Sequence, residues 1–496
     1  MNESLPLAAT WLQIVTPAAH FIGGRFVAAT GGATLPMVDP SDGNAFAEIA
    51  RGNAADVGAA VDAAQVACDG TWGRLAPVDK GRALARLSQV IGAHAEELAL
   101  IEARDCGKPL TQARADVVAC ARYFEFYAGA CDKLTGDTIP YADDYTVLTW
   151  REPHGVTAHI IPWNYPLQIF GRSVGGALAA GNACVVKPAE DACLSLLRIA
   201  QLSFDAGLPA GALNLVTGLG AEAGAALAAH PSIRHMSFTG SPVTGAAVAA
   251  SCAAHHCPVT LELGGKSPQI VFDDADVALA LPAIVNAIVQ NAGQTCSAGS
   301  RLLVQRGIYE SFLAQLAARF ATLRVGPALA DLDCGPLIRA SQLARARGFV
   351  DGATRDGIAT AGAGRIDGAA PAGGFYMAPV MLRDVPPTHR LWRDEVFGPV
   401  LATAAFDDEA DAIRLANGTD FGLVAGVWTR DGGRQLRLAR ALASGQVFVN
   451  CYGAGGGVEL PFGGVRHSGH GREKGFVALH GFTTLKTVVL RHGNGN

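Results

Sequence analysis

The chain has 496 residues, of which 50% are hydrophobic and 17% charged, and its formal net charge is −5. This composition excludes a largely disordered chain, and the length is sufficient for two or three domains. The charge is dispersed, without the basic blocks typical of nucleic-acid binding, and no uncharged apolar run is long enough to span a membrane.

The cysteines and the N-terminal residues favour a cytoplasmic protein. Eleven cysteines are an odd number at low density, without a CxxC pair or the spacing of a disulfide framework. The first twenty residues lack the basic segment that begins a secretory signal peptide. Cys252 and Cys257 enclose two histidines, but no second ligand pair accompanies them, so we predict no metal site.

The predicted elements follow one another in distinct regions. Residues 54–127 place apolar residues three and four positions apart, which predicts helices, and residues 137–155 combine turn residues with a β-rich stretch. In the region 155–263, helical stretches separate short apolar strands at 156–163, 183–188, 212–218, 233–238 and 258–265. A second alternating region follows at 267–464. This alternation predicts the α/β class with doubly wound parallel sheets.

A β-branched stretch at 482–490 predicts one more strand near the end of the chain. Such a strand needs a partner for its backbone groups, and in an oligomer another subunit can supply it.

A glycine-rich turn in the first alternating region is typical of nucleotide binding. It runs from Gly240 to Gly245 between a predicted strand and helix, with Ser241 suited to the N-cap and Pro242 to the first helical position. The helix N-terminus would then face an anion such as a pyrophosphate, although a plain loop fits the same residues. The turn at Thr217–Gly224 is a similar candidate.

Lys187 and Glu190 follow a second predicted strand, at the edge where open α/β sheets bind ligands. The lysine can donate to ribose hydroxyls and the glutamate can accept from them. A carboxylate there would repel a 2′-phosphate, so the pair favours NAD over NADP. A solvated surface ion pair is the alternative.

Three residues have the chemistry of a reacting centre. Cys296 lies among small and polar residues in "NAGQTCSAGSR", where a cysteine kept only for packing would have aliphatic neighbours. Glu262 ends an apolar strand, where loss of solvent would raise its pKa toward that of a general base. Asn164 follows another strand, and its amide can donate to a developing oxyanion. Glu395 and Phe397 stand in a tight turn, where a capping acid and a core aromatic are the alternative roles.

Together these stretches resemble the aldehyde dehydrogenase superfamily, whose motifs "PWNYP", "KPAE", "FTGS", "ELGGK", "GQTCSAGSR", "EVFGPV" and "PFGG" occur here in the family's order. The resemblance implies that Cys296 is the nucleophile, Glu262 the general base, and Asn164 the oxyanion donor together with the Cys296 N–H. It also implies NAD as cofactor, an aldehyde as substrate, and two further sets of residues. The cofactor set is Ile161, Trp163, Lys187, Glu190, Gly220, Gly240, Ser241, Gly245, Leu263, Glu395 and Phe397, and the substrate set is Tyr165, Gln168, Arg172 and Tyr452.

The same resemblance implies an aldehyde dehydrogenase-like fold of two doubly wound α/β domains and a β oligomerisation arm. Residues 1–130 and 153–264 would form the NAD-binding domain, 265–465 the catalytic domain, and 131–152 with 466–496 the arm. The arm implies a homodimer or homotetramer.

Two features bear on the substrate. Arg172 lies about two helical turns beyond Asn164, and its guanidinium would suit the carboxylate of a semialdehyde, although a structural ion pair is an equal alternative. The loop 450–464, which the resemblance places at the cleft mouth, is nearly all glycine between Tyr452 and Val458. This favours a roomy mouth and bulky or aromatic aldehydes, although a glycine-rich turn without a substrate role is the alternative. Glu459 in this loop would disfavour anionic substrates if it pointed inward.

Three other functions stay open at this point. A relative that transfers the acyl group to CoA would need no hydrolytic base, which the presence of Glu262 disfavours. An NADP-preferring enzyme and a catalytically silent structural homologue are the other two.

Overall fold

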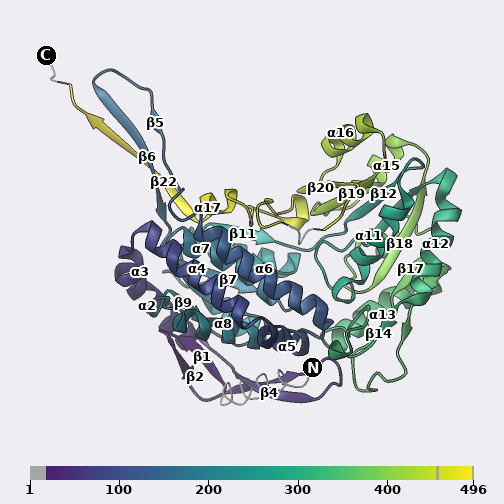
Figure 1. The fold of residues 1–496 in the computed structure, drawn as a ribbon, viewed down its shortest axis with the longest axis horizontal. Coiled ribbons are helices and arrows are strands. Elements are labelled where there is room, and N and C mark those ends of the chain that lie inside the picture. Colours follow the sequence, from purple (N-terminus) through teal and green to yellow (C-terminus); the bar gives the residue numbers. More distant parts are fainter. Residues whose placement is uncertain (1–17, 454–456, 494–496) are drawn as a thin grey trace.

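The computed structural model describes residues 18–453 and 457–493. Two lobes, each built on an open sheet with helices on its faces, stand beside one another, and a long β arm projects from the first (Figure 1). The predicted α/β class with doubly wound sheets and an arm is confirmed. Within the described residues, no helix combines the length and apolarity needed to cross a membrane.

The first sheet has eight strands in the order β2-β1-β9-β8-β7-β10-β11-β21. The five from β9 to β11 run parallel, while β1 and β21 join the sheet antiparallel. The bounds are β1 Ala19–Ile22, β2 Arg25–Ala28, β7 Val156–Ile161, β8 Ala183–Pro188, β9 Leu213–Leu215, β10 His235–Thr239, β11 Val259–Glu262 and β21 Gly469–His470. The five parallel strands fall on the five predicted strands.

Helices cover both faces of this sheet and bury nearly all residues of its parallel strands. Every residue of β8 is buried, which explains why such strands read as continuous apolar runs rather than alternating ones. The helices between the parallel strands are α7 Pro166–Ala179, α8 Leu194–Asp205, α9 Ala225–Ala228 after the π-helical turn η1 Gly220–Gly224, and α10 Pro242–Ala253. The predicted helical region contains α2 Ala54–Asp69, α3 Thr71–Arg74, α4 Pro77–Ala93, α5 Ala95–Cys106 and α6 Leu110–Ala128.

The second sheet has seven strands in the order β15-β17-β18-β13-β12-β19-β20, all parallel except the edge strand β15. Its strands are β12 Pro268–Val271, β13 Arg301–Gln305, β15 Thr360–Ala363, β17 Val380–Leu382, β18 Val400–Phe406, β19 Val424–Trp428 and β20 Gln446–Val449. Its main helices are α11 Val277–Val289, α12 Tyr309–Thr322, α13 Ala340–Arg355, α15 Glu409–Ala416 and α16 Gly432–Ala441. Two small sheets pair β3 Thr34–Val38 with β4 Ala45–Ala50 and β14 Arg324–Val325 with β16 Arg365–Ile366.

The arm is a three-stranded sheet of β5 Thr138–Ile139, β6 Tyr145–Pro153 and β22 Thr483–Arg491. The C-terminal strand β22 pairs antiparallel with β6 of its own chain along its whole length, so its partner need not come from another subunit. The segment from residue 466 onward, which was predicted to belong to the arm, contributes to both the first lobe and the arm. Its part at β21 pairs with β11 in the first sheet, α17 Val477–Gly481 contacts α7, and only β22 enters the arm sheet.

Candidate active site

The first sheet places its polar site residues at one edge, because parallel strands end together there. Asn164 follows β7, Lys187 lies near the end of β8, and Glu262 is the last residue of β11. This is the edge at which open α/β sheets bind ligands. The loop that carries Cys296 follows α11 of the second lobe, and Cys296 lines the same clefts as Asn164 at this edge.

The Cys296 loop begins with an unusual backbone. Asn291, Ala292 and Gly293 have φ angles of 48°, 53° and 73°, so three consecutive residues adopt the left-handed conformation that L side chains rarely take. Hydrogen bonds hold the turn: the Asn291 main-chain N–H donates to the Gln112 side chain at 2.8 Å, and the Asn291 side-chain amide donates to the carbonyl of Asn164 at 2.9 Å. Strain sustained in this way is typical of functional loops.

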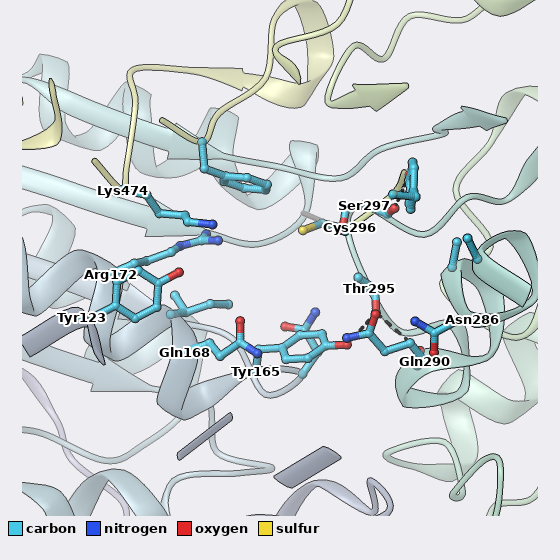
Figure 2. Close-up of a pocket in the computed structure, with 17 residues that line it drawn as sticks. Tyr123, Tyr165, Gln168, Arg172, Asn286, Gln290, Thr295, Cys296, Ser297 and Lys474 are labelled. Atoms are coloured by element: carbon cyan, nitrogen blue, oxygen red, sulfur yellow. Dashed lines mark hydrogen bonds between the residues drawn. The ribbon is translucent and has the colours of Figure 1, made fainter. Parts of the chain in front are cut away.

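Cys296 lies where two clefts meet. The substrate-side cleft, with an empty volume of about 690 Å³, lies between α6, α7, α11 and the C-terminal segment (Figure 2). The cofactor-side cleft, with about 1400 Å³, lies between the first sheet edge and α13. Cys296 and Asn164 line both clefts, and Glu262 lines the cofactor side. A group in either cleft can therefore reach the sulfur.

Cys296 is partly exposed, and the protein around its thiol disfavours the ionised form. Burial raises its pKa to about 11, the Arg172 guanidinium opposes that shift, and Glu395 and Glu262 add to it. The thiol is thus protonated near neutral pH in this structure, and thiolate formation requires a proton acceptor.

Glu262 is a buried carboxylate, 2% exposed, on the cofactor side. Among the described residues, neither of its carboxylate oxygens has a hydrogen-bond partner. Burial raises the pKa of this carboxyl group well above its usual range, while Arg172 favours the ionised form and Glu473 opposes it. A carboxylate in this state binds a proton more readily than an exposed one, as a general base must.

Asn164 is held with its amide at the junction of the clefts. Its Nδ2 donates to the carbonyl of Gln294 at 2.9 Å, two residues before Cys296. The amide has a second N–H, and the side chain is buried and oriented by this contact. A fixed donor beside a nucleophile is the arrangement that stabilises a developing oxyanion.

Tyr165, Gln168 and Tyr452, three residues of the predicted substrate set, all line the substrate-side cleft. Figure 2 labels the first two of them. The Tyr165 hydroxyl shares a hydrogen bond of 2.9 Å with Thr295, and the Tyr452 hydroxyl donates to the Ser297 carbonyl at 2.6 Å. Both tyrosines therefore brace the residues on either side of the cysteine.

Arg172 also lines this cleft, but it forms the structural ion pair that was the alternative to a substrate contact. Its Nε donates to the buried carboxylate of Glu473, and its Nη2 donates to Thr239 at 3.2 Å. Glu473 in turn accepts a hydrogen bond of 2.6 Å from Ser237. The protein itself thus satisfies much of the guanidinium.

Several cleft residues were missed by the sequence reasoning. Lys474 lies beside Arg172 in the substrate-side cleft, and no motif pointed to it (Figure 2). Helical periodicity predicts that Tyr123 and Asn286 lie on helices, but it does not indicate that their side chains face a cleft. On the cofactor side, the unpredicted residues include Arg339, Gln342, Arg345 and Arg390.

The cofactor-side cleft offers the groups that a dinucleotide requires. Ser241 caps α10, accepting from the Thr244 N–H at 3.2 Å, and the N-terminus of this helix borders the cleft, where an anion is favoured. The Glu395 carboxylate accepts from the Gly265 N–H at 3.0 Å, and burial raises its pKa to about 7. The Phe397 ring lies 5.3 Å from that of Trp163 in an edge-on arrangement, and both rings border the cleft.

Glycines at the bottom of this cleft are required by close packing. A Cβ on Gly245 would lie 2.6 Å from the Leu263 side chain, and one on Gly264 would lie 2.2 Å from the Glu395 carboxylate. Leu263 and Gly245 thus fix the path of the chain below the cleft rather than line it, and Gly240 lines it directly.

Lys187 and Glu190 form an ion pair of 2.7 Å, in which the lysine is only 2% exposed and the glutamate is half-buried. The lysine therefore differs from the solvated pair considered as the alternative. Burial opposes ionisation of Glu190, but Lys187 lowers the pKa of this carboxylate below its usual value, and the backbone N–H groups of Glu190 and Gly220 add to the effect. Ile161 is the last residue of the neighbouring strand β7 and is buried. These residues lie together at the sheet edge without lining the cofactor-side cleft itself.

Comparison with known proteins gives a consistent result. The sequence model of the aldehyde dehydrogenase family matches residues 26–488. A hydroxyisobutyraldehyde dehydrogenase of Mycolicibacterium austroafricanum is 43% identical over 96% of this chain and 94% of its own length. A Burkholderia cenocepacia crystal structure, described as an aldehyde dehydrogenase candidate, is 66% identical, with a TM-score of 0.95 and coverage of 96% of this chain and 100% of that one. The NAD⁺ complex of a Bacillus cereus aldehyde dehydrogenase is 37% identical, with a TM-score of 0.95 and 98% coverage of both chains.

Proposed function

Because the chain belongs to the aldehyde dehydrogenase family, we propose that it oxidises an aldehyde to the carboxylic acid with NAD as cofactor. The observation that supports this most directly is the position of Cys296 at the junction of two clefts, one of which also contains Glu262. A nucleophile, a base and a fixed amide donor are thus brought together from three separate parts of the chain.

The proposed reaction begins when the Cys296 thiol gives its proton to a base, and the resulting thiolate adds to the aldehyde carbon and forms a tetrahedral thiohemiacetal. The Asn164 amide and the Cys296 main-chain N–H donate to its oxyanion. NAD⁺, when bound, supplies the acceptor for the hydride that leaves this carbon. A thioester on Cys296 is then hydrolysed by water from which Glu262 takes a proton, and the acid is released with the thiol restored.

The cofactor-side residues support NAD as the dinucleotide. Glu190, with Lys187, is suited to ribose hydroxyls and would repel a 2′-phosphate, while the N-terminus of α10 is suited to the pyrophosphate. Glu395 is proposed to bind the second ribose, and Phe397 with Trp163 to border the nicotinamide. Two proteins that are each 37% identical to this chain, one from Bacillus cereus and one from Pseudomonas, have been solved with this cofactor.

We further propose a homo-oligomer in a reducing, cytoplasmic compartment. The arm carries apolar side chains that are at least half exposed, Trp150, Leu485 and Val489, which is typical of a surface that another subunit covers. All eleven cysteines are free thiols, as expected where disulfides are reduced. We propose that the enzyme accepts bulky or aromatic aldehydes. The glycine-rich loop that suggests this includes residues 454–456, which lie outside the described ranges.

An assay of the purified protein with propanal and NAD⁺, followed by NADH absorbance, tests the function. We expect turnover without CoA and a lower kcat/KM with NADP⁺. Cys296→Ala should be folded and inactive, whereas Cys451→Ala, which removes an exposed thiol, should keep the activity. Turnover that requires CoA would instead identify an acylating enzyme, and a folded protein inactive on every aldehyde would identify a silent homologue.

A further inference from the structure

The substrate-side cleft has a positively charged end. Lys474 and Arg172 lie beside one another across the cleft from Cys296, whose sulfur points into the space between them (Figure 2). Both cations approach the Phe462 ring, with the Arg172 Cζ at 4.8 Å and the Lys474 Nζ at 5.8 Å from its centroid. Among the described residues that line this cleft, two are cations and none is a carboxylate.

Two buried side chains of the protein hold Arg172. Arg172 is bound to Glu473 and Thr239, so a carboxylate behind the cleft wall balances its charge. Lys474 brings a second positive charge to the same end of the cleft. Burial lowers the pKa of Lys474 to about 8, with Arg172 acting in the same direction and Glu459 and Glu262 opposing it. The ammonium form therefore still predominates at neutral pH.

The backbone shows that Lys474 occupies a constrained position. Its φ angle is 64°, a conformation that glycine adopts freely and other residues rarely do, and the residue is 1% exposed. Gly475 follows with a φ of 63°, so two consecutive residues are left-handed. A long cationic side chain retained at such a position is a reason to look for a function.

Glu459, which would oppose an anionic substrate if it pointed inward, points elsewhere. Its carboxylate pairs with Arg122 at the surface, half of its side chain is exposed, and it does not line the cleft. Tyr123, in contrast, lies at the same end of the cleft as Arg172 and adds a hydroxyl (Figure 2). Phe462, Ile169 and Tyr165 add apolar and aromatic surface to the walls of this cleft.

We propose that Lys474 binds a carboxylate at the far end of the substrate, so that the preferred substrates are aldehydes with a second, acidic group. This inference rests on the proposed function and specifies its substrate class. The aldehyde carbon would lie at Cys296, the linking carbons between the apolar walls, and the carboxylate at Lys474. Lys474 is thus a specificity-determining residue, and Arg172 helps to hold this end of the cleft in place.

Two matched pairs of substrates test the inference: 4-oxobutanoate with butanal, and 4-carboxybenzaldehyde with benzaldehyde. We expect the wild-type enzyme to have a kcat/KM at least about tenfold higher for the acidic member of at least one pair. Lys474→Met should reduce this preference by about 10- to 100-fold, mainly through KM, and leave oxidation of the uncharged aldehyde within about threefold. Lys133→Met removes a charge from an exposed ion pair and should leave the preference unchanged.

The possible results separate this inference from the proposed function. An enzyme that oxidises butanal but prefers neither acidic aldehyde overturns the inference alone, as does a Lys474→Met variant that retains the preference. Failure to oxidise any of the four aldehydes overturns the proposed function as well. If Lys474→Met does not fold, the wild-type ratios and the methyl ester of 4-oxobutanoate decide: equal kcat/KM for ester and acid contradicts the carboxylate contact, and a lower value for the ester supports it.

Discussion

Arg172 on α7 donates a hydrogen bond to Glu473, a residue 301 positions later in the sequence, and both side chains are buried. We predict that Arg172→Met lowers kcat/KM by a similar factor for acidic and uncharged aldehydes, because the guanidinium serves the protein rather than the substrate. Removing one partner also leaves a buried carboxylate uncompensated, which costs about 3–5 kcal/mol of stability. Kinetics on the matched aldehyde pairs and a thermal denaturation scan measure both effects. A loss confined to acidic aldehydes would assign the carboxylate contact to Arg172 instead of Lys474.

Glu262→Gln should slow hydrolysis of the thioester more than its formation. The amide cannot take a proton from water, whereas the thiol and the oxyanion donors remain in place. In rapid-mixing experiments with propanal, we expect about one equivalent of NADH per site, followed by a stalled steady state. Glu310→Gln, an exposed glutamate on α12, is the matched control and should turn over normally. A Glu262→Gln variant without this stall would remove Glu262 from the deacylation step.

Asn164→Ala should lower kcat by about 10²–10³-fold, the usual effect of losing one oxyanion donor. Its amide also bonds to the Gln294 carbonyl, so the loop that carries Cys296 must be shown to be intact in the variant. Equal rates of Cys296 alkylation in the variant and the wild type would provide that control. Unchanged turnover in a variant with an intact loop would contradict the role.

The cofactor-free protein should show slow alkylation of Cys296 at neutral pH. Burial raises the pKa of this thiol to about 11, and the thiolate is the reactive form. Below that pKa the thiolate fraction rises with pH, so the rate with iodoacetamide should increase about tenfold per pH unit between about pH 7 and pH 10. Mass spectrometry of the peptide that contains Cys296 gives the rate. A plateau near pH 8 would show that the thiol is ionised more readily than its surroundings indicate.

A buried charge cluster behind the cleft should determine stability. Lys108 donates to Glu102 at 3.0 Å and also to Asp116, and these side chains are almost fully buried. Lys108→Met would leave two carboxylates near each other without a cation, which costs about 3–5 kcal/mol. We expect a clear fall in the thermal midpoint.

Lys133→Met is the control for this cluster, because its pair with Asp132 is exposed and contributes at most about 1 kcal/mol. Equal midpoints for the two variants would show that the buried cluster adds nothing to stability.

Much of the fold could be predicted from the sequence because its signals are local. Each parallel strand of the first sheet is a short apolar run that ends at a turn. Ser241 caps α10 and Pro242 lies in its first turn, as expected for a serine and a proline at these positions. The pairing of β22 was less accessible. A β-branched sequence indicates that a strand needs a partner. It does not indicate whether that partner is β6 of the same chain, as observed, or a strand of another subunit.

The site was predictable where it follows the strands and not where it depends on long-range contacts. Asn164 and Glu262 lie at strand ends, so topology brings them together. The state of Arg172 depends on Glu473, which sequence spacing cannot relate to it. Lys474 reaches the cleft because the chain after residue 469 returns to the first sheet, a path that local periodicity does not reveal.

The pairing of β21 with β11 also has a consequence for the order of events during synthesis. Leu261 and Glu262 of β11 pair with His470 and Gly469, which are synthesised more than two hundred residues later. Contacts of such high sequence separation form slowly and late. Glu262, the proposed base, is therefore enclosed only after residues 469 and 470 have been synthesised, and a nascent chain without them leaves this edge of β11 unpaired.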